Sequence, residues 1–235
     1  MRKGIITLAV IGMIVGVLMA FGPLVVNFFS DRGLRTADIT AGGEPASVGV
    51  DGSWHVVRGA GDNTSQAGYT FDEKLPSGSK TTSGRTEKVE GDFKVEGKKL
   101  TEGKVTVDVA SISSDVEKRD INVRNHILHT DEFPKASFTL TKPADVSQLP
   151  DDGTTGKVKI TGDLELHGQK NSVTTDLKVL RTGENVVLQG NVPFNRGDFG
   201  IETPQFVAST IADEGTVDLL LVLEQVKYCL LYTSD

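Results

Sequence analysis

Cysteine is nearly absent from this sequence, and basic residues are outnumbered by acidic ones. Cys229 is the only cysteine in 235 residues, so one chain can form neither a disulfide nor a cysteine-based metal site. The chain has 25 Lys and Arg against 32 Asp and Glu, a formal net charge of −7. A surface of this sign repels phosphate backbones and anionic headgroups, which argues against nucleic acid and against electrostatic docking to a membrane.

Sequence signatures of catalysis and metal binding are also missing. No Ser sits in a G-x-S-x-G elbow of the kind that serves nucleophilic hydrolases. His126 and His129 are three residues apart with Asp131 close by, but no further ligands follow at a recognisable spacing, and zinc normally takes three or four protein ligands. We therefore expect no enzyme, no metal site and no cofactor.

The longest apolar run, Gly4 to Phe29, contains no charged residue and follows Arg2 and Lys3. A bilayer needs about 20 such residues, whereas a cleaved signal peptide has a shorter apolar core and small residues at its cleavage site. Leu18 stands where a small residue would be needed before Ala20. The sequence therefore favours an uncleaved transmembrane anchor over residues 1–30, with cleavage as the alternative, and places the remaining chain on the extracytoplasmic side of the cell membrane as a single-pass protein.

Composition divides the chain beyond the anchor into three parts. Residues 31–52 are small, polar and glycine-rich, which is typical of a flexible linker. Residues 53–226 carry the regular apolar patterns of one folded domain. Residues 227–235 break those patterns and resemble translated adapter sequence, so they are left out of the fold prediction.

Strict period-two alternation dominates the folded part, as in strands with one buried face. The clearest case is Gly156–Leu180, where two alternating stretches flank a turn at Gly168 and predict a long antiparallel hairpin in which Glu165 faces solvent. Seven or so similar stretches follow the same rule, and residues 115–128 provide the one helical segment. Residues 75–84 (LPSGSKTTSG) are polar and predict a mobile loop. Eight to ten strands with one helix indicate a sandwich or a closed barrel.

Five short motifs carry a resemblance to a known family. They are Ser111–Asp115 (SISSD), Arg119–Asp120 (RD), Phe133–Phe138 (FPKASF), Gly162–Gly168 (GDLELHG) and Arg196–Ile201 (RGDFGI). In this order they resemble the signature of the YceI-like family. The apolar N-terminus followed by a Gly/Pro/Ser-rich tether is similar to the membrane-bound actinobacterial branch of that family.

The resemblance implies an all-β fold, an eight-stranded antiparallel lipocalin-like barrel with one short helix, here preceded by a transmembrane helix. It implies an apolar tunnel that binds a polyisoprenoid chain, such as a quinone tail or a prenyl carrier lipid. Family members are often exported and linked to envelope stress. A barrel of eight strands either just fills its interior or holds one small ligand, so the residues alone leave a packed core as the alternative.

The expected tunnel wall consists of large residues in phase on alternating strands: Phe71, Phe93, Val107, Phe138, Leu164, Leu166, Leu177, Phe194, Phe199, Leu219 and Leu221. Arg119 and Asp120 are either contacts to a ligand headgroup or structural residues that join the helix to a loop, and we favour the structural role.

Three functions remain open at this point. The first is an extracytoplasmic carrier of an isoprenoid lipid. The second is a packed-core module that binds another envelope protein and leaves an apolar patch near residues 75–84. The third is an enzyme that acts on a bound isoprenoid, which would need a polar cluster inside the cavity.

Overall fold

The computed structural model describes Val15 and residues 33–39, 42–61, 63–75, 78–202 and 210–227. The chain separates into two units, Met1–Arg32 and Gly33–Asp235. Apart from Val15, the predicted anchor lies outside the described residues, as does the tail from residue 228. Within the described residues, no helix combines the length and the apolar character needed to cross a membrane.

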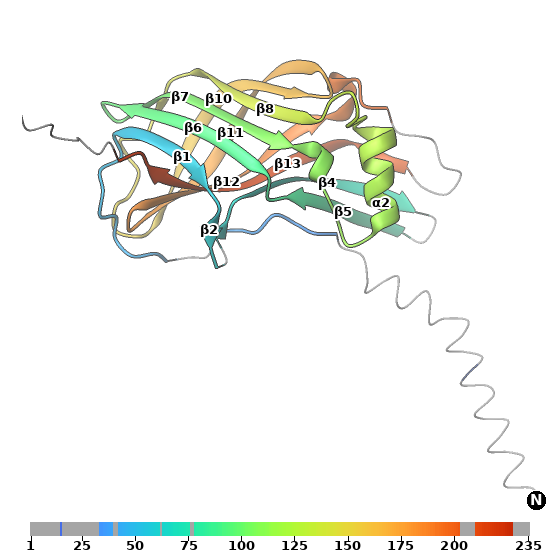
Figure 1. The fold of residues 1–235 in the computed structure, drawn as a ribbon, viewed down its shortest axis with the longest axis horizontal. Helices are drawn as coiled ribbons and strands as arrows, with labels where there is room; N and C mark the ends of the chain where they lie inside the picture. Colours follow the sequence, from blue (N-terminus) through green and yellow to red (C-terminus); the bar gives the residue numbers. More distant parts are fainter. Residues whose placement is uncertain are drawn as a thin grey trace, which may run out of the picture. The chain divides into compact units, whose positions relative to one another are not determined.

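The second unit is an antiparallel barrel in which eight strands form a closed ring (Figure 1). Each strand pairs with the next in the order β1-β6-β7-β8-β10-β11-β12-β13, and β13 pairs back to β1. This confirms the predicted eight-stranded barrel. The strands of the ring are β1 (Gly52–Val57), β6 (Val89–Glu96), β7 (Lys99–Asp108), β8 (Lys135–Lys142), β10 (Thr155–Leu166), β11 (Gln169–Thr182), β12 (Asn185–Asn195) and β13 (Thr210–Gln225).

The predicted hairpin is formed by β10 and β11. Leu166 pairs with Gln169, so the turn consists of His167 and Gly168, which have φ of 53° and 72°. Two residues with positive φ form the turn that matches the right-handed twist of paired strands. Glu165 is exposed and the apolar face of β10 is buried, as the alternation predicted.

β13 is long enough to pair with two strands, one after the other, along the same edge. Its C-terminal half pairs with β1, and its N-terminal half pairs with β4 (Gln66–Leu75), which in turn pairs with β5 (Gly78–Thr86). The prediction of a mobile loop at residues 75–84 was therefore wrong, because most of this segment is strand β5. The polar composition of β5 fits a strand whose side chains form hydrogen bonds with its neighbour. The buried Ser83 hydroxyl, for example, is hydrogen-bonded to the Thr70 hydroxyl of β4.

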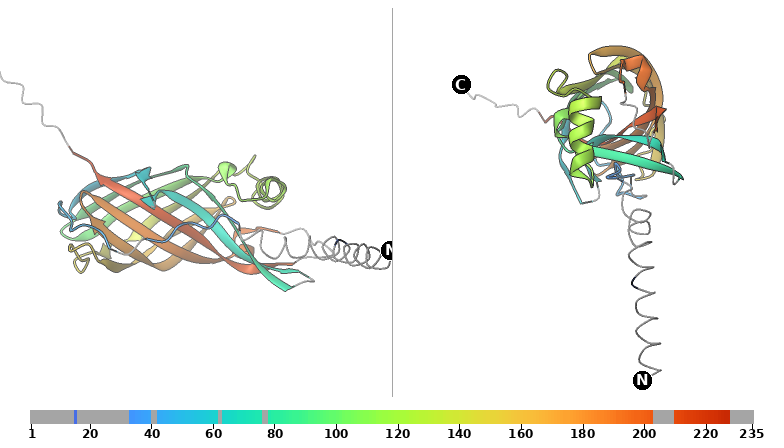
Figure 2. Two further views of the ribbon diagram at one scale, coloured as in Figure 1. Left: turned by 90° about the horizontal axis from the view of Figure 1, so that it is seen from below. Right: turned by 90° about the vertical axis from the view of Figure 1, so that its right-hand side faces the viewer.

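One helical segment lies at the end of the barrel formed by β4, β5 and the start of β13 (Figures 1 and 2). It consists of α2 (Glu117–Asn122) continued by the π-helical turn η2 (Val123–Ile127). The predicted helix at 115–128 is confirmed, with its start two residues later. The remaining elements are β2 (Gly59–Ala60), β3 (Asn63–Thr64), β9 (Ala144–Asp145), and the 3-10 turns η1 (Val109–Ser111) and η3 (Arg196–Phe199).

The segment predicted as a flexible linker is packed against the barrel over its described residues, 33–39 and 42–50, which corrects that expectation. Ile39 is only 4% exposed and packs with Leu180, Leu220 and Val222 on the outer face of the sheet. Farther along, the Ala46 amide donates to the Asp151 carbonyl at 2.8 Å. The segment, here called the strap, explains why β13 is apolar on both faces: one face points into the barrel and the other lies under the strap.

Two of the sequence motifs pack against each other. A side chain at Gly162 would overlap the Phe138 ring, and a side chain at Gly168 would lie 2.6 Å from the Phe133 ring. The glycines of GDLELHG therefore make room for the two phenylalanines of FPKASF. This contact holds β8 beside β10 and fixes the inward direction of Phe138.

Candidate functional site

The barrel encloses an inner cavity of about 130 Å³. Every side chain around it is aliphatic or aromatic except those of Gly103 and Ser137. At the end away from α2, Trp54, Val146 and Leu149 are among the lining residues. The Trp54 indole N–H donates to the Val50 carbonyl at 2.9 Å, so this polar group needs no partner inside the cavity.

A larger outer chamber of about 460 Å³ lies at the α2 end. It shares Ala67, Val107, Ala136, Leu164 and Val217 with the lining of the inner cavity, so the two spaces meet end to end. Residues of α2 and η2 form part of its wall. The right view in Figure 2 looks onto this end, with α2 across part of the barrel opening.

Ten of the eleven predicted wall residues line these two spaces. The inner cavity has Phe93, Phe138, Leu177, Leu219 and Leu221; the outer chamber has Phe71, Leu166 and Phe194; and Val107 and Leu164 border both. Whether they contact a lipid stays a prediction.

Phe199 is the exception and belongs to neither lining. It lies in η3, is 1% exposed and packs edge-on against Phe194, with ring centroids 5.7 Å apart. Strand alternation cannot predict the side-chain direction of a residue in a 3-10 turn. For this reason the prediction that Phe199 lines the tunnel was wrong. Phe199 packs against Phe194, which lines the outer chamber, and does not reach the chamber itself.

Most polar residues of the two linings belong to the outer chamber, and the sequence reasoning did not single out most of them. The Tyr69 hydroxyl, the Thr82 hydroxyl and the Arg196 Nε are buried without a hydrogen-bond partner, and all three residues line this chamber. Burial raises the pKa of Tyr69 above its usual range, and the positive charge of Arg119 partly opposes that shift. The available signal for Tyr69 was its position two residues before Phe71, on the same face of β4.

Arg119 and Asp120 have separate roles. The Asp120 carboxylate accepts hydrogen bonds from the Ser114 amide at 2.8 Å and the Ser114 hydroxyl at 2.6 Å, so it ties α2 to the preceding loop. Arg119 pairs with Asp115 at 2.7 Å and also lines the outer chamber. The structural role fits Asp120, whereas Arg119 combines a structural ion pair with a place in the chamber wall.

The histidines considered for metal binding do not form a larger cluster. The His129 ring lies beside His167, with centroids 5.4 Å apart, and His167 Nδ1 lies 3.1 Å from the Phe199 carbonyl oxygen. Among the described residues, no group of three or more His, Cys, Asp or Glu side chains is placed to hold a metal ion.

The arrangement is suited to one long ligand with an apolar body. A narrow apolar cavity receives the body, and the wider chamber offers unpaired donors to a polar end. Such convergence of an apolar pocket with a few polar groups is typical of small-molecule binding sites.

Comparisons with known proteins identify the family and the fold. The model of the YceI-like domain matches residues 61–223. A UPF0312 protein of Shewanella denitrificans is 31% identical over 153 residues, which covers 61% of this chain and 74% of the relative. Two solved structures share the fold: BcnA of Burkholderia cenocepacia (TM-score 0.53, 21% identity, 67% of this chain and 95% of that one) and a polyisoprenoid binding domain from Saccharophagus degradans (TM-score 0.55, 16% identity, 74% and 98%).

The family model covers more than half of the chain, and the motifs that carried the resemblance fall within it. The five motifs lie around the outer chamber or support its walls. The chain belongs to the YceI-like domain family.

Proposed function

We propose that this chain is an extracytoplasmic binding protein that holds a polyisoprenoid or a similar apolar lipid inside its barrel. The observation that carries the proposal is the inner cavity, whose lining is aliphatic and aromatic apart from Gly103 and Ser137. Each buried CH₂ group contributes about 0.8 kcal/mol to binding, so a chain of many such groups gains affinity without any polar contact.

The position of the polar groups gives the ligand a direction. The apolar tail occupies the inner cavity as far as Trp54, and the polar end stays in the outer chamber near Tyr69 and Thr82. The polyisoprenoid binding domain of Saccharophagus degradans, which shares this fold, supports the ligand class.

The location of the protein is part of the same proposal. The apolar run Gly4 to Phe29 anchors the chain in the cell membrane, and the barrel stays on the extracytoplasmic side, as in the membrane-bound actinobacterial branch. A role in envelope stress follows from the family resemblance alone.

The cavity distinguishes this proposal from the alternative of a packed-core interaction module. That alternative predicts a filled interior and an apolar patch near residues 75–84. The structure has space inside the barrel, and most of that segment is the polar strand β5.

The test is native mass spectrometry of the full chain purified in detergent, before and after lipid extraction. We expect an added mass in the range of a prenyl lipid before extraction and recovery of that mass when an isoprenoid is returned. Ala136→Phe places a ring where the two spaces meet and should reduce the bound fraction at least tenfold. Ala110→Phe, at an exposed position in η1, is the matched control and should bind normally.

Thermal unfolding of both variants checks that the barrel has formed. A folded wild-type protein that never carries or accepts an apolar molecule would overturn the proposed function. Equal binding by both variants would show that the ligand does not occupy the junction of the two spaces.

A further inference from the structure

We propose that the α2 end of the barrel rests on the bilayer surface, so that the outer chamber opens toward the membrane and takes its lipid directly from it. This inference rests on the proposed function, both its membrane anchor and its apolar ligand. It adds an orientation and a docking surface, called here the mouth rim and made of Leu34, Lys118 and Ile121.

The strap fixes the point at which the chain joins the barrel. The Leu34 amide donates to the Ser83 carbonyl at 3.1 Å, and an Arg85 Nη1 donates to the Arg35 carbonyl at 3.0 Å. Ser83 is next to Thr82 on β5, and Thr82 lines the outer chamber. The chain therefore attaches at the chamber end of the barrel and only afterwards follows the outer wall toward the opposite end.

Chain length then limits how far this end can lie from the anchor. Only five residue steps separate Phe29, the end of the apolar run, from Leu34. At a maximum of about 3.6 Å per residue, they span at most about 18 Å. If residues 4–29 cross the bilayer, Leu34 stays within that distance of its interface. The described strap residues, 33–39 and 42–50, are bound to the barrel and add no free length.

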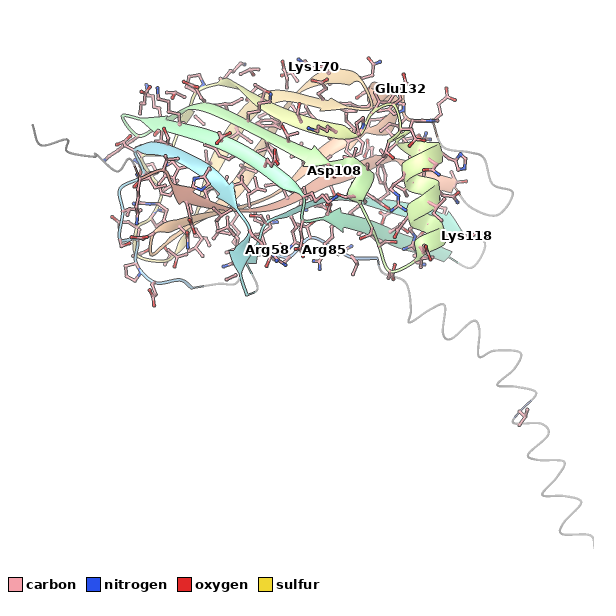
Figure 3. The ribbon with its side chains drawn as sticks, viewed as in Figure 1. Arg58, Arg85, Asp108, Lys118, Glu132 and Lys170 are labelled. Atoms are coloured by element: carbon pink, nitrogen blue, oxygen red, sulfur yellow. The ribbon has the colours of Figure 1, made fainter. Side chains whose placement is uncertain are left out.

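Exposed apolar side chains mark the same end. In the described part of the barrel unit, the exposed large hydrophobic residues are Leu34, at 37%, and Ile121, at 44%. Ile121 lies three residues after Lys118, so the two share one face of α2. Lys118, which Figure 3 labels beside α2, lines the outer chamber and is exposed. The chamber therefore reaches the surface beside this face.

The chemistry of the mouth rim selects the partner. A net charge of −7 opposes binding to anionic lipid, so the attraction comes from the anchor and from apolar contact rather than from charge. Lys118 can lay its methylene stem along an apolar surface and keep its ammonium in the headgroup layer. The surface that fits is a zwitterionic lipid interface.

At the opposite end, the described strap residues lie against the barrel: the Ser47 amide donates to the Gly183 carbonyl at 2.8 Å, and an Arg181 Nη2 donates to the Val48 carbonyl at 2.9 Å. Val48 and Val50 pack against the core. A lipid that enters from the membrane therefore meets the outer chamber first and the apolar cavity second.

The experiment uses the full chain, with Cys229→Ser, reconstituted into phosphatidylcholine vesicles. Ile121→Cys and Lys118→Cys place a bimane label on the mouth rim, and Gln148→Cys places it at an exposed position of the opposite end. Headgroup spin-labelled lipid should quench the two rim labels at least threefold more than the Gln148→Cys label. Equal quenching at both ends, or failure of the protein to stay with the vesicles, would overturn the inference.

A second measurement tests the consequence for lipid uptake. Twenty Gly/Ser residues inserted between Arg32 and Gly33 release the barrel from the anchor without changing the barrel. We expect uptake of a fluorescent isoprenoid from the same vesicles to slow at least fivefold, while binding of that isoprenoid from detergent stays unchanged. Unchanged uptake would contradict the inference. Loss of binding from detergent in the wild-type chain would instead contradict the proposed function, so the two failures are distinguishable.

Discussion

Tyr69 is a phenol in the wall of the outer chamber whose hydroxyl is buried without a hydrogen-bond partner. Burial favours its neutral form and raises its pKa above the ordinary value near 10. An acid whose folded-state pKa is raised contributes stability below its unfolded pKa and loses it as pH rises through the range above pH 10. We therefore expect the free energy of unfolding of the wild type to fall more steeply than that of Tyr69→Phe as pH rises above about 10.

Chemical denaturation followed by circular dichroism at pH 7, 9, 10 and 11 measures this difference. At pH 7 the two proteins should be nearly equal in stability, because the lost hydroxyl has no partner in the structure. Parallel pH profiles would show that the Tyr69 phenol is not held neutral by burial.

Residue-level prediction succeeded where strand alternation applies and failed where it does not. Leu164 and Leu166 were placed on the inner face because β10 alternates strictly over twelve residues. Phe199 was misplaced because a 3-10 turn has no period of two. Thr82 escaped notice because a small hydroxyl in a polar stretch gives no sequence signal of an inward direction.

The strap was expected to be a flexible linker that contributes nothing to the stability of the fold, and the structure shows it packed against the barrel. A flexible tether would tolerate any substitution, whereas Ile39 is buried among Leu180, Val187, Leu220 and Val222. Ile39→Ala removes several buried methyl and methylene groups and leaves a cavity, which typically costs about 2–4 kcal/mol. We expect a loss of this size in urea unfolding of the detergent-solubilised chain.

Asp38→Ala is the matched control, since Asp38 is the exposed neighbour of Ile39 and its change should cost less than about 0.5 kcal/mol. A tether-like strap would give the same unfolding midpoint for both variants.

The elements that the sequence reasoning missed share a physical cause. β5 and the strap are polar and rich in Gly, Ser and Thr. β5 is fixed by backbone pairing with β4, and the strap by backbone hydrogen bonds to residues far away in the chain. Backbone pairing of this kind leaves no apolar period, so local pattern favours a loop. The β10–β11 hairpin was predictable because its turn and both of its alternating faces lie within one continuous stretch.

At the scale of the whole molecule, the barrel interior has an apolar space at one end and a partly polar space at the α2 end, and the sequence motifs are concentrated near the α2 end. The family resemblance supplied the ring of eight strands and the idea of a tunnel. The division of the interior into two spaces followed only from the structure, since it depends on how Ala67, Ala136 and Val217 from three strands meet.

Trp54 can report which end of the ligand enters the inner cavity, because it is the only tryptophan in the chain and lines that cavity. If the tail enters first, an isoprenoid brominated at its tail end should quench Trp54 emission by about half or more. The same lipid brominated next to its polar group should leave the emission within about a tenth of its starting value. Removing the lipid should also lower the unfolding temperature, because a ligand at a hundred times its Kd stabilises the folded state by about 2.7 kcal/mol. Stronger quenching by the head-brominated lipid would mean that the polar end lies against Trp54, and the direction assigned to the ligand would have to be reversed.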